Sequence, residues 1–292
     1  MSKIKAATEV IRREGYWSLL LKASQLVKSQ VESRAAEDVA KSKRGSYRTL
    51  CKGGAFNRPH YGFSAWLVGK QAERLGYEKV SLIEFGVAGG NGLLNLEKHA
   101  SRLEKQLDIS YEIYGFDLGE GLPAPADYRD SPYHWDRGHY KMDVELLEKK
   151  IDRSELILGD VADTTPNFVS EYDPAPIGAM YVDLDYYSST KDAFEILSVE
   201  DEYILPRVSM YFDDILDGHG LRMTIPQIGE LLAIKEFNQD SDQEAIGKLQ
   251  MDEEEWSEIR PRRQYAYHRF DHNMYAKYIG KEDRQIPLDI DE

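Results

Sequence analysis

Five short runs of apolar, β-branched and aromatic residues recur along the chain after residue 58, and stretches of helical periodicity separate them. Such runs are typical of strands buried on both faces of a parallel sheet, with helices covering those faces. The expected strands are Val80–Val87, Tyr111–Asp117, Leu156–Val161, Ala179–Asp185 and Val208–Ile215. The expected helices are Ser64–Leu75, Leu93–Leu107, Val144–Ile151, Thr190–Leu197 and Thr224–Phe237.

Near the end of the chain, Arg263–Phe270 and Met274–Ile279 carry alternating aromatic residues on either side of a short polar turn. This pattern predicts an antiparallel hairpin. Together the elements predict an α/β fold: a doubly wound, mostly parallel seven-stranded sheet with an antiparallel C-terminal hairpin. We expect the acidic stretch Asp240–Glu255 to be a solvated helix or loop.

The first 57 residues differ from the remainder in charge and pattern. Residues 1–58 contain 13 Lys and Arg side chains against 5 Asp and Glu, and apolar positions recur there at near-helical spacing. We therefore predict a helical N-terminal extension over residues 1–57 and a main domain over 58–292. The extension is expected to cover the main domain or to mediate oligomerisation, and the alternative is a helix lying on an anionic membrane.

Composition narrows the function classes. The 292-residue chain has 52 acidic and 37 basic side chains and a net charge of −15, which disfavours nonspecific binding of nucleic acid. A single cysteine, Cys51, excludes an intramolecular disulfide and a cysteine-based zinc site, and we expect it to be a buried hydrophobe. Because no apolar run approaches the roughly 18 residues that span a bilayer, we expect a soluble, cytoplasmic protein without membrane contact.

The first predicted strand runs into a glycine-rich loop. In a doubly wound sheet the ligand lies beyond the carboxyl ends of the strands, and Glu84–Gly92 reads EFGVAGGNG at such an end. The dinucleotide fingerprint is incomplete, because Asn95 stands at the position of its third glycine. An acidic residue two positions before the first glycine resembles the loop of class I methyltransferases that use S-adenosylmethionine. The alternative is an ordinary strand-to-helix turn.

The next two predicted strands also end in polar groups that suit a nucleoside. Asp117 is placed to accept hydrogen bonds from two ribose hydroxyls, although alone it could cap a helix. Asp160 or a nearby carbonyl can accept from an adenine amino group while Val161 packs on the ring, and Tyr61 is expected to lie over the cofactor. The candidate cofactor-binding residues are Tyr61, Glu84, Gly86, Val87, Gly89, Asn91, Asp117, Leu118, Asp160, Val161 and Asp183.

The fourth and fifth predicted strands end in carboxylates. If the two strands are neighbours, their ends lie about 5 Å apart, so Asp183, Asp213 and Asp214 can converge. Three carboxylates at one point need an offsetting charge, and a divalent cation with oxygen ligands, Mg²⁺ first, is the expected partner. The alternative is that these residues cap helices or are solvated.

These motifs together resemble the macrocin O-methyltransferase (TylF-like) family of metal-dependent sugar methyltransferases, over roughly residues 58–220. Departures from the family pattern, which bear on the acceptor, are Leu118-Gly119 in place of Thr-Phe, Leu184 in place of a common glycine, and Glu202–Pro206 in place of Gly-Gly. The residues that carry the resemblance are Glu84–Gly90, Gly115–Asp117, Glu120–Pro123, Gly159–Val161 with Asp163-Thr164, Asp183–Asp185 with Tyr187 and Ser189-Thr190, and Asp213-Asp214.

The resemblance implies a class I methyltransferase domain that transfers a methyl group from S-adenosylmethionine to a hydroxyl of a sugar or glycosylated small molecule. It implies Mg²⁺ held by Asp183, Asp213 and Asp214. Asp185, on the same strand face as Asp183, is the candidate general base, and His219 is the second candidate. Alternatives are a phenolic or catechol-like acceptor, or a noncatalytic nucleoside-binding scaffold. We expect a homo-oligomer.

Residues 122–142, between the second and third predicted strands, are rich in aromatic side chains interleaved with Asp and Arg. Such a mixture suits a carbohydrate, whose rings have apolar faces and polar edges. We expect this insertion to form a mobile lid over the acceptor, and the alternative is a plain surface insertion. Its aromatic residues are Tyr128, Tyr133, His134, Trp135, His139 and Tyr140.

Overall fold

The computed structural model describes residues 46–216 and 221–280. Most of the predicted N-terminal extension lies outside the described residues. Its described end contains α3 (Tyr47–Lys52), which packs on α4 (Pro59–Leu75). The Tyr47 hydroxyl lies 2.5 Å from Nδ1 of His99 in a buried hydrogen bond, and Cys51 is fully buried as expected. No helix of the described residues is long and apolar enough to span a membrane.

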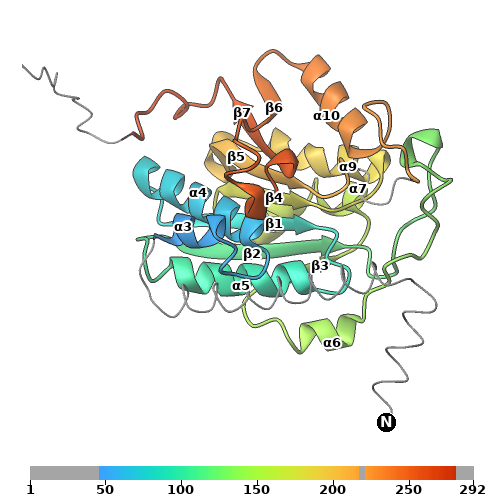
Figure 1. The fold of residues 1–292 in the computed structure, drawn as a ribbon, viewed down its shortest axis with the longest axis horizontal. Helices are drawn as coiled ribbons and strands as arrows, with labels where there is room; N and C mark the ends of the chain where they lie inside the picture. Colours follow the sequence, from blue (N-terminus) through green and yellow to red (C-terminus); the bar gives the residue numbers. More distant parts are fainter. Residues whose placement is uncertain (1–45, 217–220, 281–292) are drawn as a thin grey trace, which may run out of the picture.

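The sheet has seven strands in the order β3-β2-β1-β4-β5-β7-β6 (Figure 1). Strands β1 to β5 are mutually parallel, whereas β7 is antiparallel to both β5 and β6, which confirms the predicted fold class. The order reverses between β1 and β4, so the carboxyl ends of these two strands form the switch point. The bounds are β1 Lys79–Phe85, β2 Ser110–Asp117, β3 Glu155–Leu158, β4 Ile177–Val182, β5 Ile204–Phe212, β6 Glu244–Lys248 and β7 Gln264–Arg269.

Each face of the sheet has its own hydrophobic core. Along β1, Val80 and Leu82 pack with residues of α3, α4 and α5, whereas Ile83 and Phe85 pack with residues of α8, α9 and α10. In Figure 1, α5 and α10 lie on opposite sides of the sheet. The other helices are α5 Asn91–Leu103, α6 Val144–Glu148, α7 Val161–Thr164, α8 Phe168–Tyr172, α9 Tyr187–Ala193 and α10 Gly229–Asp240, with 3₁₀ segments η1 Tyr128–Asp130, η2 Phe194–Ser198, η3 Asp201–Tyr203, η4 Ser257–Ile259 and η5 Pro261–Arg263.

The C-terminal antiparallel pair is made differently from the prediction. Strand β7 pairs with β6, which lies inside the acidic stretch predicted to be a solvated helix or loop, and Met274–Ile279 forms no strand. Strand β6 is an edge strand in which Ile246 is the one fully buried residue, so it lacks the apolar run that marks the inner strands. The Asn238 side chain, from α10, bonds the Ile246 backbone at N and O and fixes its position.

A close approach of β1 and β4 determines the turn at the switch point. Gly86 has φ +82°, and a Cβ built on it would lie 1.9 Å from the Asp183 carbonyl oxygen. Gly89, three residues later in the same loop, has nothing within 4 Å of such a Cβ. The glycine at position 86 is therefore required by packing and by backbone conformation, whereas the glycine at position 89 is not.

We predict that Gly86→Ala lowers the free energy of unfolding by about 2 kcal/mol or more, because it combines a left-handed backbone with a backbone clash. Gly89→Ala is the matched control and should change it by less than about 0.5 kcal/mol. Urea unfolding of both variants measures the difference, and equal losses would show that the β1–β4 contact does not constrain the turn.

Candidate active site

A cavity of about 370 Å³ opens at the carboxyl ends of the strands, at the switch point of the sheet. The loops after β1, β2 and β3 line one half of the cavity. The loops after β4 and β5 and residues of the 122–142 insertion line the other half. The residues that line the first half include Gly86, Ala88, Asp117, Leu118, Gly159, Asp160 and Val161. The residues that line the second half include Leu122, Pro123, His134, Trp135, His139, Tyr140, Asp183, Asp185, Ser189, Asp213, Asp214, Leu216, Arg222 and Arg263.

Six of the eleven candidate cofactor residues line this cavity: Gly86, Asp117, Leu118, Asp160, Val161 and Asp183. The other five, which do not line it, are Tyr61, Glu84, Val87, Gly89 and Asn91. The structure thus brings the ends of the first four predicted strands together at one cavity.

The Asp117 carboxylate connects the end of β2 to the glycine-rich loop. Its Oδ2 accepts hydrogen bonds from the backbone N of Val87 at 2.9 Å and of Ala88 at 2.8 Å. Its Oδ1 accepts from the backbone N of Gly119 at 2.6 Å. A carboxylate has about four acceptor positions, so one remains for a ligand. Asp117 therefore shapes the glycine-rich loop, and its hydrogen bonding to ribose hydroxyls stays a prediction.

Glu84 and Tyr61 form a buried pair behind the cavity. The Tyr61 hydroxyl donates to Oε1 of Glu84 at 2.9 Å, and Oε2 has no hydrogen-bond partner among the described residues. Burial raises the pKa of Glu84 to about 7, although the nearby Arg58 opposes the shift. Tyr61 is fully buried against Tyr181 and does not line the cavity. The sequence predicted that Tyr61 lies over the cofactor, whereas in the structure it is a hydrogen-bond partner of Glu84.

Strands β4 and β5 are neighbours, as predicted, and Val182 pairs with Phe212 just before the carboxylates begin. Burial and then the charge of Asp214 raise the pKa of both Asp183 and Asp185. Asp185 is 7 % exposed and has φ +61°, a left-handed conformation rare outside glycine. Such backbone strain is concentrated at functional positions in proteins.

Asp213 is ion-paired with two arginines at the edge of the carboxylate group. Its Oδ1 accepts from the Tyr211 hydroxyl at 2.6 Å and lies 2.5 Å from Nη1 of Arg263 and 3.1 Å from Nη1 of Arg260. Burial opposes ionisation here, but the Tyr211 hydrogen bond and the charge of Arg263 outweigh it and lower the pKa of Asp213. Asp213 is therefore stabilised in its charged form through Oδ1.

Sequence reasoning missed two residues that hold Asp214. Arg222, which is 5 % exposed and lines the cavity, donates from Nη1 to Oδ1 of Asp214 at 2.8 Å. Glu230 of α10 is fully buried, and its Oε2 accepts from the backbone N of Asp214 at 2.9 Å. Burial and the charge of Asp214 raise the pKa of Glu230. Both residues follow the strand in sequence and look like ordinary charged positions, so no local signal distinguishes them.

A divalent cation could bind here only through carboxylate oxygens that are not already paired with protein groups. No group of three or more His, Cys, Asp or Glu side chains within residues 46–216 and 221–280 has the arrangement of a metal site. Asp183, Asp213 and Asp214 all line the cavity, and Oδ1 of Asp213 is ion-paired with two arginines, so the metal trio stays a prediction. Asp183 and Asp214 fit better: Oδ2 of Asp214 is buried and has no partner among the described residues. Mg²⁺ is commonly bound by one or two carboxylates with waters, which these two can supply. His219 lies outside the described residues.

The 122–142 insertion forms a wall of the cavity. It is closed at its base, where the Leu122 N donates to the His139 O and the Gly138 N to the Leu122 O, both at 2.8 Å. The Trp135 ring lies 5.7 Å from the Arg222 guanidinium carbon. His134, Trp135, His139 and Tyr140 line the cavity, as predicted for a lid, whereas Tyr128 and Tyr133 are largely exposed. The mobility of the insertion stays a prediction.

Similarity to solved structures identifies the fold of the chain. No family model matches the chain, and no curated protein sequence matches it. Among solved structures, the calicheamicin methyltransferase CalS11 is similar with a TM-score of 0.51 and 19 % identity, over 84 % of this chain and 93 % of that one. The chain therefore has a methyltransferase fold, as its sequence predicted.

Two further structures are similar at lower scores. The O-methyltransferase NovP has a TM-score of 0.46 and 14 % identity, over 71 % of this chain and 80 % of that one. The apo form of CalS11, described as a TDP-rhamnose 3′-O-methyltransferase, has a TM-score of 0.42 and 19 % identity, over 84 % and 95 % of the two chains.

The raised pKa of Glu84 predicts a pH-dependent stability difference. A carboxyl whose folded pKa is raised stabilises the protein below its unfolded pKa, and the contribution is lost as pH rises through about 7. Glu84→Gln mimics the protonated form, so it should exceed the parent in unfolding free energy by about 2 to 3 kcal/mol at pH 8 and by little at pH 4.5. Urea unfolding at the two pH values measures this, and a pH-independent difference would contradict it.

Proposed function

We propose that this protein is an S-adenosylmethionine-dependent O-methyltransferase acting on a hydroxyl of a sugar or glycosylated small molecule. The observation that carries the proposal is one cavity at the switch point with nucleoside-type groups on one side and buried carboxylates on the other. The fold similarity to CalS11, named as a calicheamicin methyltransferase, supports it. A noncatalytic scaffold would need no buried carboxylates beside a cofactor cavity.

The first half of the cavity suits the methyl donor. Asp160 begins α7 and accepts from the Ala162 N through Oδ1, which leaves its other oxygen to accept from an adenine amino group. Val161 offers an apolar contact for the ring, and Asp117 has one acceptor position for the ribose. Carboxylates exceed arginines in the lining, and this excess attracts a positively charged sulfonium.

The second half suits a hydroxyl acceptor. Methyl transfer to a hydroxyl needs the oxygen aligned with the methyl group and a base to take the proton. Asp185 lines the cavity, and within the described chain no basic side chain forms an ion pair with it, so its carboxylate is available as the base. Trp135 and Tyr140 can pack against the apolar face of a sugar ring while Asp214 and Arg222 meet its polar edge.

Dependence on Mg²⁺ belongs to the same proposal. Asp183 and Asp214 are the carboxylates that would hold the ion, because Asp214 keeps a buried, unpaired Oδ2 beside its Arg222 ion pair, whereas Oδ1 of Asp213 meets two arginines and the Tyr211 hydroxyl. When bound there, a divalent cation supplies Lewis-acid stabilisation of an ionising hydroxyl. The unpaired Oδ2 of Asp214 and the mutual repulsion of Asp183 and Asp214 support this part of the proposal.

Binding of the demethylated product, S-adenosylhomocysteine, tests the cofactor half. Calorimetry should detect binding, and Asp117→Ala should weaken it by at least about 1.5 kcal/mol, since the change removes an acceptor and releases the loop at Val87 and Ala88. Asp163→Ala, an exposed change on α7, is the control and should have no effect. Tight binding of NAD with no response to S-adenosylhomocysteine would contradict the proposal.

Turnover with a panel of deoxysugar and phenolic acceptors tests the acceptor half. We expect methyl transfer that is lost on chelation and restored by added Mg²⁺. Asp214→Asn, which removes one anionic oxygen at nearly constant volume, should sharply reduce transfer while leaving the affinity for S-adenosylhomocysteine within about 1 kcal/mol. Transfer that survives exhaustive chelation would reject the metal and keep the methyltransferase, whereas transfer to phenols alone would reject the sugar acceptor.

A further inference from the structure

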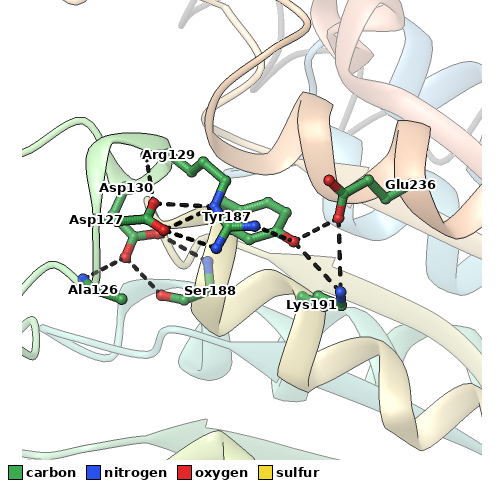
Figure 2. Close-up of polar contacts among 8 residues, drawn as sticks. All are labelled: Ala126, Asp127, Arg129, Asp130, Tyr187, Ser188, Lys191 and Glu236. Atoms are coloured by element: carbon green, nitrogen blue, oxygen red, sulfur yellow. Dashed lines mark hydrogen bonds and ion pairs between the residues drawn. The ribbon is translucent and has the colours of Figure 1, made fainter.

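A cluster of polar side chains outside the cavity joins the 122–142 insertion to α9 and α10 (Figure 2). We refer to it as the anchor cluster. Figure 2 shows that its side chains come from three separate segments of the chain and point toward one another around the Tyr187 ring. Its members are Asp127, Arg129, Asp130, Tyr187, Ser188, Lys191 and Glu236.

Asp130 connects the insertion to the beginning of α9. It is 1 % exposed, and its carboxylate accepts three hydrogen bonds. Two come from Ser188, from the backbone N and from Oγ, each at 2.9 Å, and one comes from the Ala126 N at 2.8 Å. A buried carboxylate with three donors is held firmly, because the loss of any donor leaves a desolvated charge.

Tyr187 connects the insertion to α10. The Arg129 guanidinium carbon lies 4.3 Å from the Tyr187 ring centroid, and Nη1 of Arg129 donates to the Tyr187 hydroxyl at 3.1 Å. The same hydroxyl donates to Oε2 of Glu236 at 2.5 Å. Asp127 binds the remaining side of the guanidinium at 2.8 Å and so orients Arg129 over the ring. The Tyr187 side chain thus receives charge-assisted hydrogen bonds at its hydroxyl and a cation–π contact on its ring.

Both sides of the anchor cluster continue directly into the acceptor half of the cavity. On the insertion side, Ser131 follows Asp130, and its carbonyl accepts from the backbone N of His134 at 2.8 Å and of Trp135 at 3.1 Å. On the helix side, Asp185 lies two residues before Tyr187, and Ser189 lines the cavity. The cluster therefore spans the two walls between which an acceptor would lie.

The cofactor half is held by other hydrogen bonds, although α7, which follows Asp160, packs on α9. The loops after β1, β2 and β3 are held by Asp117 and by the N-cap at Asp160, and none of the bonds of these two carboxylates involves a member of the anchor cluster. A change in the cluster should therefore alter the spacing of the acceptor walls and leave the cofactor loops in place.

We propose that Tyr187 is a positioning residue for the acceptor: through Arg129 it fixes the aromatic wall of the insertion relative to Asp185, while Glu236 of α10 holds its hydroxyl in place. This rests on the proposed function, because it assumes that the second half of the cavity binds the acceptor. Tyr187 does not itself line the cavity, so it acts through the residues it holds.

Tyr187→Phe tests the proposal, because it removes the hydroxyl and keeps the ring under Arg129. Tyr267→Phe is a matched control: the Tyr267 hydroxyl also donates to a glutamate, Oε2 of Glu244 at 2.6 Å, and also meets an arginine, but on β6 and β7 away from the cavity. The KM of the panel acceptor with the highest turnover and the Kd of S-adenosylhomocysteine are measured for both. Trypsin cleavage after Arg137 and Lys141, which are exposed in the insertion, is measured alongside.

For Tyr187→Phe we expect an acceptor KM raised about tenfold, the scale of one lost hydrogen bond to a charged group, with an unchanged Kd and faster cleavage. Tyr267→Phe should change none of these. Ser188→Ala, which removes one hydrogen bond to Asp130, should shift KM and the cleavage rate in the same direction. It replaces Tyr187→Phe as the test variant if Tyr187→Phe fails to fold. Equal KM values and cleavage rates for the Tyr187 and Tyr267 variants would overturn the proposal.

The failure of the proposed function looks different. If the parent protein binds no S-adenosylhomocysteine or methylates no acceptor, the proposed function fails, whatever the variants do. Slow trypsin cleavage of the parent and fast cleavage of Tyr187→Phe would still support the anchoring of the insertion, and equal cleavage would overturn it.

Discussion

Repulsion among buried carboxyl groups is the constraint on which the arrangement of this molecule depends. Asp183, Asp185 and Asp214 gather where two parallel strands end, and Glu230 lies directly behind them. Such a group is stable when cations, protons or a bound ligand offset its charge. The protein supplies Arg222 to Asp214, and supplies Arg260 and Arg263 to the neighbouring Asp213. Segments that follow β5 in the chain therefore supply the positive charges that the carboxylates at the end of β5 require.

The two halves of the cavity are stabilised by different means. In the half proposed for the cofactor, one carboxylate, Asp117, gathers backbone N–H groups from two loops, so the shape of the site depends on main-chain hydrogen bonds. In the half proposed for the acceptor, the walls are joined by side chains of the anchor cluster. Main-chain geometry tolerates changes of neighbouring side chains better than side-chain bonding does. A fold of this kind can retain one ligand while its other specificity changes.

The sequence predicted the elements that carry periodic or local signals. The inner strands were found because β4, for example, is buried at every position. Asp117, Asp160 and Asp185 were singled out because each lies at the end of a strand or within three residues of it. Strand β6 was missed, since an edge strand with one buried residue has no apolar pattern. Glu230 and Arg222 were missed for another reason: their partner, Asp214, is reached by folding of a later segment, which no local pattern records. Tyr61 was expected to face the cofactor, but its position follows from the depth of α4 in the core.

The left-handed backbone at Asp185 narrows the course that evolution can take at this position. Glycine, asparagine and aspartate accept such a conformation most readily, and β-branched residues accept it least. Asparagine and glycine are therefore the replacements that preserve the backbone at the smallest cost, and neither is an acid. On the proposed function, a lineage that lost the chemistry but kept the fold would carry asparagine or glycine at position 185.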